Sequence, residues 1–153
     1  MSTANVTPQI ALARVDDLLN KVYVSGLVLL TIDVVQNGLR QVQFLNPVWF
    51  WPALLSILIS QAGILYSVWL GGNVVLWYRA MVFSTLFSIS SWPLQIGANA
   101  LQSGQHPWIW WSVGIASITS VGAFGVVFAV LMNLLFPIIW FLVQTSEFGG
   151  RTE

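Results

Sequence analysis

The sequence predicts an all-α membrane protein: a four-helix transmembrane bundle preceded by a short N-terminal amphipathic helix. Of its 153 residues, 57% are hydrophobic and only 7% are charged, whereas about a quarter of the residues are charged in a soluble domain. The hydrophobic residues form runs long enough to cross a bilayer. Tryptophans lie near the ends of these runs, at the depth that aromatic rings prefer. We expect one membrane domain, residues 1–153.

The N-terminal segment predicts the amphipathic helix. Thr7 and Pro8 suit the first positions of a helix, and apolar side chains then recur at helical spacing as far as Val22. The other faces carry Arg14, Asp16, Asp17 and Lys21. This pattern is typical of a helix that lies at the membrane surface and runs into the first span. A plain extension of that span is the alternative.

We expect spans at residues 22–39, 48–70, 74–97 and 109–142. Gly71, Gly72 and Asn73 join the second and third spans as a tight antiparallel hairpin. The stretch 108–143 is ambiguous, because a single helix of this length would measure about 52 Å against about 30 Å of hydrocarbon. Gly122 and Gly125 could bend it and Pro137 could kink its end, but two full spans do not fit. We therefore predict one long tilted or kinked helix.

Charge and tryptophan placement predict the orientation. The positive-inside rule places both termini in the cytoplasm, in a membrane of the bacterial cytoplasmic kind, because only Arg40 falls on the outer side. The expected cytoplasmic basic residues are Arg14, Lys21, Arg79 and Arg151. The expected outer tryptophans are Trp49, Trp51, Trp92, Trp108, Trp110 and Trp111, and the inner ones are Trp69, Trp77 and Trp140. The proposed topology anchors are Arg14, Lys21, Arg79, Trp69 and Trp140.

Small residues recur down one face of three spans. They are Ala53, Ser56, Ser60, Gly63 and Ser67 in the second span, Ala80, Ser84, Ser88 and Ser91 in the third, and Ser112, Ala116, Thr119 and Ala123 in the last. Such faces let membrane helices approach closely and allow hydroxyls to bond across them. They predict either ordinary packing inside one bundle or the docking of a partner subunit.

Asp33 is the one carboxylate well inside a predicted span, and an acid at that depth is a functional candidate. If the bundle is antiparallel, an intramembrane polar layer forms from Asp33, Ser60, Gln61, Ser88, Thr119 and Ser120. This layer could bind a cation or relay a proton, since desolvation favours the protonated acid. Alternatively, Asp33, Asn37 and Arg40 form a polar stripe that leads to the outer surface or faces another subunit.

Several classes of function are excluded by composition. The chain has no cysteine and a single histidine, His106, which rules out thiolate and bis-histidine metal or haem sites. Without net charge it has no basic stripe for nucleic acid. It also lacks a nucleophile elbow, a phosphate-binding glycine loop and paired carboxylates within a span. We therefore expect no cofactor and no enzymatic activity.

These observations predict a non-enzymatic membrane subunit of a larger transport, secretion or energy-converting complex. Its partners would be the lipid bilayer and other membrane subunits, or copies of itself. One alternative is a small ion channel or an oligomeric, holin-like pore-former. Another is a truncated sensor domain, in which Gly149 and Gly150 begin a linker.

A particular transporter family is also an alternative. An amphipathic start, a first span followed by Arg40, and Asn46-Pro47-Val48-Trp49 opening the next span occur in that order. Over roughly the first half of the chain, this order resembles the small membrane subunit of tripartite periplasmic transporters. The resemblance implies a four-helix transporter subunit. Phe50, Trp51 and Pro52 stand where that family usually has acidic residues.

Overall fold

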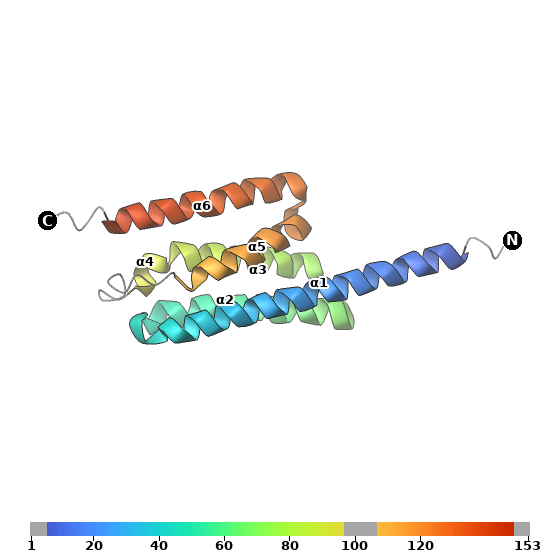
Figure 1. The fold of residues 1–153 in the computed structure, drawn as a ribbon, viewed down its shortest axis with the longest axis horizontal. Coiled ribbons are helices and arrows are strands. Elements are labelled where there is room, and N and C mark those ends of the chain that lie inside the picture. Colours follow the sequence, from blue (N-terminus) through green and yellow to red (C-terminus); the bar gives the residue numbers. More distant parts are fainter. Residues whose placement is uncertain (1–5, 97–106, 149–153) are drawn as a thin grey trace.

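A computed structural model describes residues 6–96 and 107–148, which are helical almost throughout (Figure 1). The elements are α1 (Val6–Gln41), the 3-10 turn η2 (Val42–Phe44), α2 (Pro47–Tyr66), the π-helical turn η3 (Ser67–Gly71), α3 (Val74–Ser90), α4 (Trp92–Gln95), α5 (Ile109–Phe124) and α6 (Val126–Phe148). No strand occurs in these two ranges, and Leu45 and Ile96 form an isolated antiparallel bridge. The predicted all-α class is confirmed.

Helix α1 has 36 residues without a break. Its N-terminal part projects beyond the other helices (Figure 1), and residues 12–20 are all exposed. The structure thus has no separate amphipathic helix before the first span. It shows the alternative, in which the N-terminal segment extends that span.

The α2–α3 hairpin agrees with the prediction. Asn46 begins α2 because its side chain accepts a hydrogen bond from the Val48 amide, 3.0 Å away, and Asn73 does the same for α3 with the Leu76 amide at 3.1 Å. Between the helices, Gly71 has a φ of 86°, a conformation that is costly for a residue with a Cβ. Local sequence therefore sets this turn.

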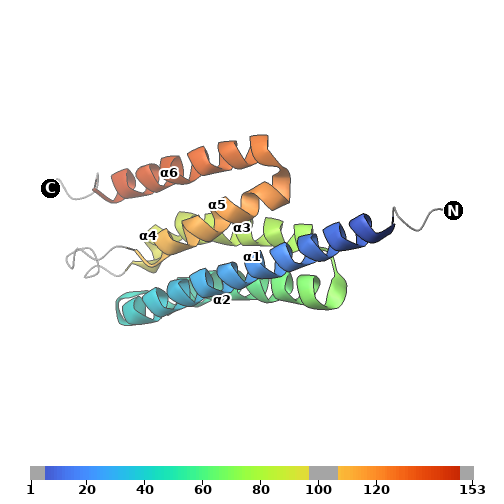
Figure 2. The same cartoon turned by 45° about the vertical axis from the view of Figure 1, so that its right-hand side comes forward.

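The prediction of one long helix over 108–143 is wrong. Gly125 has a φ of 81°, which ends α5 at Phe124, and α6 then begins at Val126. The chain reverses there, so α6 runs back alongside α5 (Figures 1 and 2). Glycine tolerates positive φ without a Cβ penalty. The single residue Gly125 can therefore reverse the chain where we expected only a bend.

This reversal changes the number of long helices and the position of the C-terminal end. The described chain has five long helices, α1, α2, α3, α5 and α6, in place of the expected four. The start of α1 and the end of α6 consequently lie at opposite ends of the bundle (Figure 2). That arrangement corrects the expectation that both termini share one side.

Two segments, Leu12–Phe44 and Pro47–Gly71, are long and apolar enough to cross a membrane, and α3, α5 and α6 contain shorter apolar helices. Helix α3 packs between α2 and α5, and its Met81 and Ile89 are fully buried. Large apolar side chains also cover the outside of the bundle, for example Leu70 (74% exposed) and Val127 (80% exposed). Soluble monomers rarely expose such continuous apolar surface.

Candidate functional site

The small faces of α2 and α3 meet each other inside the bundle. The hydroxyl oxygens of Ser60 and Ser84 are 3.0 Å apart, and both hydroxyls lie within hydrogen-bond distance of the Ser56 carbonyl oxygen, at 2.8 and 3.1 Å. Ser60, Gly63, Ser67, Ser84, Ser88 and Ser91 are buried, as is Ala53, whereas Ser56 and Ala80 are half-buried. These faces therefore pack within one chain and do not present a docking surface.

A glycine makes the α2–α3 approach possible. At Gly63, an added Cβ would overlap the Trp77 indole. The ring of Trp77 occupies the place where any other side chain at position 63 would lie. Glycine at this position therefore sets the helix separation.

A second polar cluster lies at the far end of α3, where sequence reasoning had not placed one. Gln95 is fully buried. Its Nε2 donates to the Ser88 carbonyl at 3.0 Å and to the Ser91 hydroxyl at 2.8 Å, and its Oε1 accepts from the Trp108 indole N–H at 3.2 Å. The Trp108 amide in turn donates to Oε1 of Gln41 at 3.1 Å. A glutamine at the end of an apolar run was the signal available in the sequence.

The predicted intramembrane polar layer does not come together around Asp33. Ser88, Thr119 and Ser120 are buried, and their hydroxyls donate to carbonyls of their own helices at 2.7 to 2.9 Å. Asp33 is exposed on the outside of α1. Within the described residues, no hydrogen bond or ion pair engages its carboxylate. The backbone carbonyl of Asp33 accepts a bond from the Asn37 side chain at 2.8 Å.

Gln61, another residue of that predicted layer, lies within hydrogen-bond distance of Thr31 on α1. The Thr31 hydroxyl lies 2.8 Å from the Leu27 carbonyl oxygen and 3.2 Å from Oε1 of Gln61. A hydroxyl has a single proton, so turning the carboxamide to donate from Nε2 to Thr31 would serve both contacts. Either orientation leaves one carboxamide atom of this buried glutamine without a partner in the described part of the chain.

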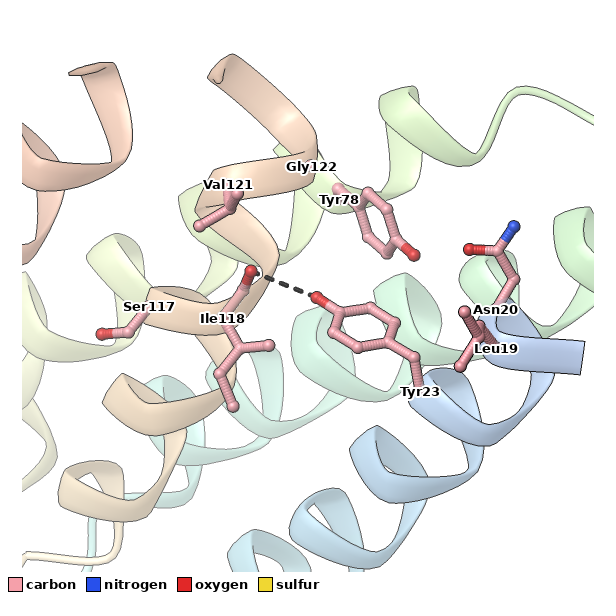
Figure 3. A pocket seen from close by; sticks show the side chains of 8 residues that line it. All are labelled: Leu19, Asn20, Tyr23, Tyr78, Ser117, Ile118, Val121 and Gly122. Atoms are coloured by element: carbon pink, nitrogen blue, oxygen red, sulfur yellow. Dashed lines mark hydrogen bonds between the residues drawn. The ribbon is translucent and has the colours of Figure 1, made fainter. Parts of the chain in front are cut away.

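A pocket of about 700 Å³ lies between α1, α3 and α5 (Figure 3). The Tyr23 hydroxyl donates to the Ile118 carbonyl at 3.1 Å, and the rings of Tyr23 and Tyr78 meet edge to face with centroids 6.2 Å apart. An added Cβ at Gly122 would come within 2.8 Å of the Tyr78 ring. The pocket walls are Leu19, Asn20, Tyr23, Tyr78, Ser117, Ile118, Val121 and Gly122.

A second hollow of about 490 Å³ continues along α1 from this pocket. Tyr23 and Ile118 line both hollows. The walls of the second are Val22, Tyr23, Gly26, Leu27, Leu29, Leu30, Asp33 and Ile118. We call the two hollows together the α1–α5 groove. It is apolar except for Asn20, Ser117 and the two tyrosine hydroxyls near one end and Asp33 at the other.

The predicted basic anchors lie at the end of the bundle where α1 enters. The Lys21 ammonium is 2.7 Å from an Asp17 carboxylate oxygen and 5.4 Å from the Trp69 ring centroid. Arg79 donates from Nε to the Ala123 carbonyl at 3.1 Å, next to the glycine that ends α5. Arg14 is exposed on the projecting part of α1, and Arg151 lies outside the described residues.

Trp140 does not join this group. Its ring lies 6.4 Å from that of Trp92 and 5.8 Å from that of Trp110, two residues that the sequence assigns to the outer side. The expected inner position of Trp140 beside Trp69 is wrong, because the turn at Gly125 reverses the helix that carries it. With this correction, Trp92, Trp110 and Trp140 share one end of the bundle.

The described residues contain no group of three or more His, Cys, Asp and Glu side chains that could hold a metal ion. His106 and the glycines at 149 and 150 fall outside the described ranges. Scans of protein-family models, of curated proteins and of solved structures found no match to this chain. The resemblance to the tripartite transporter subunit therefore stays a prediction.

Proposed function

We propose that this protein is a non-enzymatic integral membrane subunit of a larger transport, secretion or energy-converting complex. The observation that carries the proposal is the outward position of Asp33. A carboxylate that faces lipid near the middle of a bilayer costs about 2.5–3.5 kcal/mol or more. Assembly with another membrane protein would remove this carboxylate from lipid.

Several buried polar side chains in the described spans support the same reading. Ser60 on α2 and Ser84 on α3 bond across the two helices, and Thr119 and Ser120 bond to their own helix. On α1, by contrast, Asp33 and Gln36 are exposed and Asn37 is half-buried. The polar face of α1 is therefore the surface we assign to intersubunit contact.

The proposed membrane arrangement has five passes, with the N-terminal end in the cytoplasm. Lys21, Arg79 and Arg14 lie at the end where α1 enters the bundle, and Arg40 closes α1 at the other end. The positive-inside rule favours the first end as cytoplasmic. Helices α3 and α5, with 17 and 16 residues, are short for a bilayer and would need local thinning.

In-cell photocrosslinking tests assembly directly. A benzoylphenylalanine at Leu29, on the exposed α1 face, is expected to form adducts with a distinct membrane protein. The matched control is Ile59, an exposed apolar residue on α2 (59% against 68% for Leu29). Equal adducts from both positions, or adducts only between copies of this chain, would contradict the proposed heteromeric complex.

The ion-channel alternative makes a different prediction. Because Asp33 lies on the outside of the bundle, a pathway through a single chain would not include it. Reconstituted wild-type protein and Asp33→Asn are therefore expected to show the same low cation flux in liposomes. A flux that Asp33→Asn abolishes would favour the channel.

A further inference from the structure

The α1–α5 groove is long enough to hold a helix. Along α1 it extends from Leu19 to Asp33, a rise of about 21 Å at about 1.5 Å per residue. Its walls are open on one side, since Leu19 is 60% exposed and Leu29 68%. Small-molecule sites usually bury most of their ligand's surface, which this shallow groove cannot do.

A glycine in the groove favours close helix approach. Gly26 lines the wall of the second hollow, and no atom lies within 4 Å of where its Cβ would be. Interfaces between membrane helices are enriched in small residues because these let two backbones come together. Gly26 lies about two turns along α1 from Asp33, so one docked helix would contact both.

The charge of Asp33 identifies the chemistry of that helix. The described basic residues of this chain lie elsewhere: Lys21 and Arg40 are about 18 and 10 Å from Asp33 along the α1 axis, Arg79 binds the Ala123 carbonyl, and Arg14 is on the projecting part of α1. A second copy in the same orientation would bring none of these basic residues to the depth of Asp33.

We propose that the α1–α5 groove docks one transmembrane helix of a different subunit, which carries a lysine or arginine opposite Asp33. This inference rests on the proposed function and specifies its partner. Pairing replaces an unpartnered carboxylate and an unpartnered cation by one ion pair, where the low dielectric makes their attraction strong. The exposed leucines of the groove supply packing around the pair.

Model transmembrane peptides test the proposal without the natural partner. The full chain carries a donor dye at Leu12→Cys, because the natural sequence has no cysteine, and is reconstituted in phosphatidylcholine vesicles. The probes are acceptor-labelled Leu–Ala helices of about 23 residues with lysine, leucine or glutamate at the centre. Energy transfer at increasing peptide density measures binding.

We expect the lysine peptide to bind about tenfold more tightly than the leucine peptide. Asp33→Asn should remove this preference, and Asp33→Lys should transfer it to the glutamate peptide. Gly26→Leu should weaken lysine-peptide binding about tenfold, because its side chain fills the groove. The matched control Gly114→Leu, at another exposed glycine with no neighbour within 4 Å of a Cβ, should bind as the wild type does.

Several results would overturn the proposal. The charge pairing would be contradicted if the lysine and leucine peptides bound equally. It would also be contradicted if Asp33→Asn left the preference for lysine intact. If no peptide binds, the groove is occupied by lipid. If copies of this chain transfer energy to one another and Gly26→Leu abolishes this transfer, the groove is a self-association surface. Crosslinking from Leu29 to another protein would still support the proposed function in each case.

Discussion

The indole of Trp140 on α6 lies against that of Trp110 on α5, with ring centroids 5.8 Å apart and planes inclined by 59°. This contact joins the first turn of α5 to the second half of α6. It can form only because the chain turns back at Gly125. The pair is therefore direct evidence that α5 and α6 form a hairpin.

The hairpin predicts that the two chain ends face opposite sides of a membrane. We expect a cysteine at Leu12, and a cysteine appended after Glu153, to react with a membrane-impermeant maleimide from opposite sides of sealed vesicles. The natural chain has no cysteine, so labelling is specific to the introduced thiol. Labelling of both cysteines from the same side would contradict this prediction and favour the four-span arrangement.

Gly125→Ala should destabilise the hairpin. Because Gly125 has a φ of 81°, a Cβ there should lower the free energy of unfolding by about 1–2 kcal/mol. Unfolding in mixed micelles with increasing dodecyl sulfate, followed by circular dichroism, measures the change. Gly114→Ala is the control: it lies inside α5 with open space around its Cβ, and alanine should leave stability equal or raise it. Equal effects at the two positions would argue against the turn.

Gly63→Ala should separate α2 from α3. Its Cβ would overlap the Trp77 indole, and overpacking of this kind costs about 1–3 kcal/mol. The same micelle assay should show the loss, and Gly26→Ala, where no atom is close, should not. Adding Trp77→Leu to Gly63→Ala should recover part of the stability. No recovery would mean that the ring is not the obstacle.

The Ser60–Ser84 contact predicts a coupling between helices. In a double-mutant cycle of Ser60→Ala and Ser84→Ala, we expect an interaction of about 0.6 kcal/mol, typical of hydrogen bonds between membrane helices. Ser90→Ala, at an exposed serine of α3, is the control and should show no coupling to Ser60→Ala. A coupling energy of zero would mean that the two hydroxyls contribute packing but no hydrogen-bond energy.

Gln95→Leu should weaken the end of the bundle where α4 meets α5. It leaves the buried Trp108 indole N–H without its acceptor, which costs about 1–3 kcal/mol. Trp108→Phe should destabilise the protein less in the Gln95→Leu background than in the wild type. In that background the indole N–H has already lost its acceptor. Gln43→Leu, at an exposed glutamine, provides the baseline.

Part of the site was accessible from the sequence because it depends on local spacing. The faces around Ser60 and Ser84 could be identified as packing faces since residues three and four apart share one side of a helix. Asp33 was identified because an acid in an apolar run stands out. Whether it points into the bundle or outward stayed open between two alternatives, since the direction of a side chain depends on which helices pack on either side of α1.

Composition and local chemistry by themselves determined that the protein is helical and apolar on its outside, and that Asn46, Gly71 and Asn73 delimit α2 and α3. Only the tertiary structure decided whether Gly125 bends or reverses the chain, which moved Trp140 to the other end of the bundle. The physical reason is that glycine permits both conformations at similar cost. Contacts with distant residues, such as Trp140 with Trp92 and Trp110, select between them.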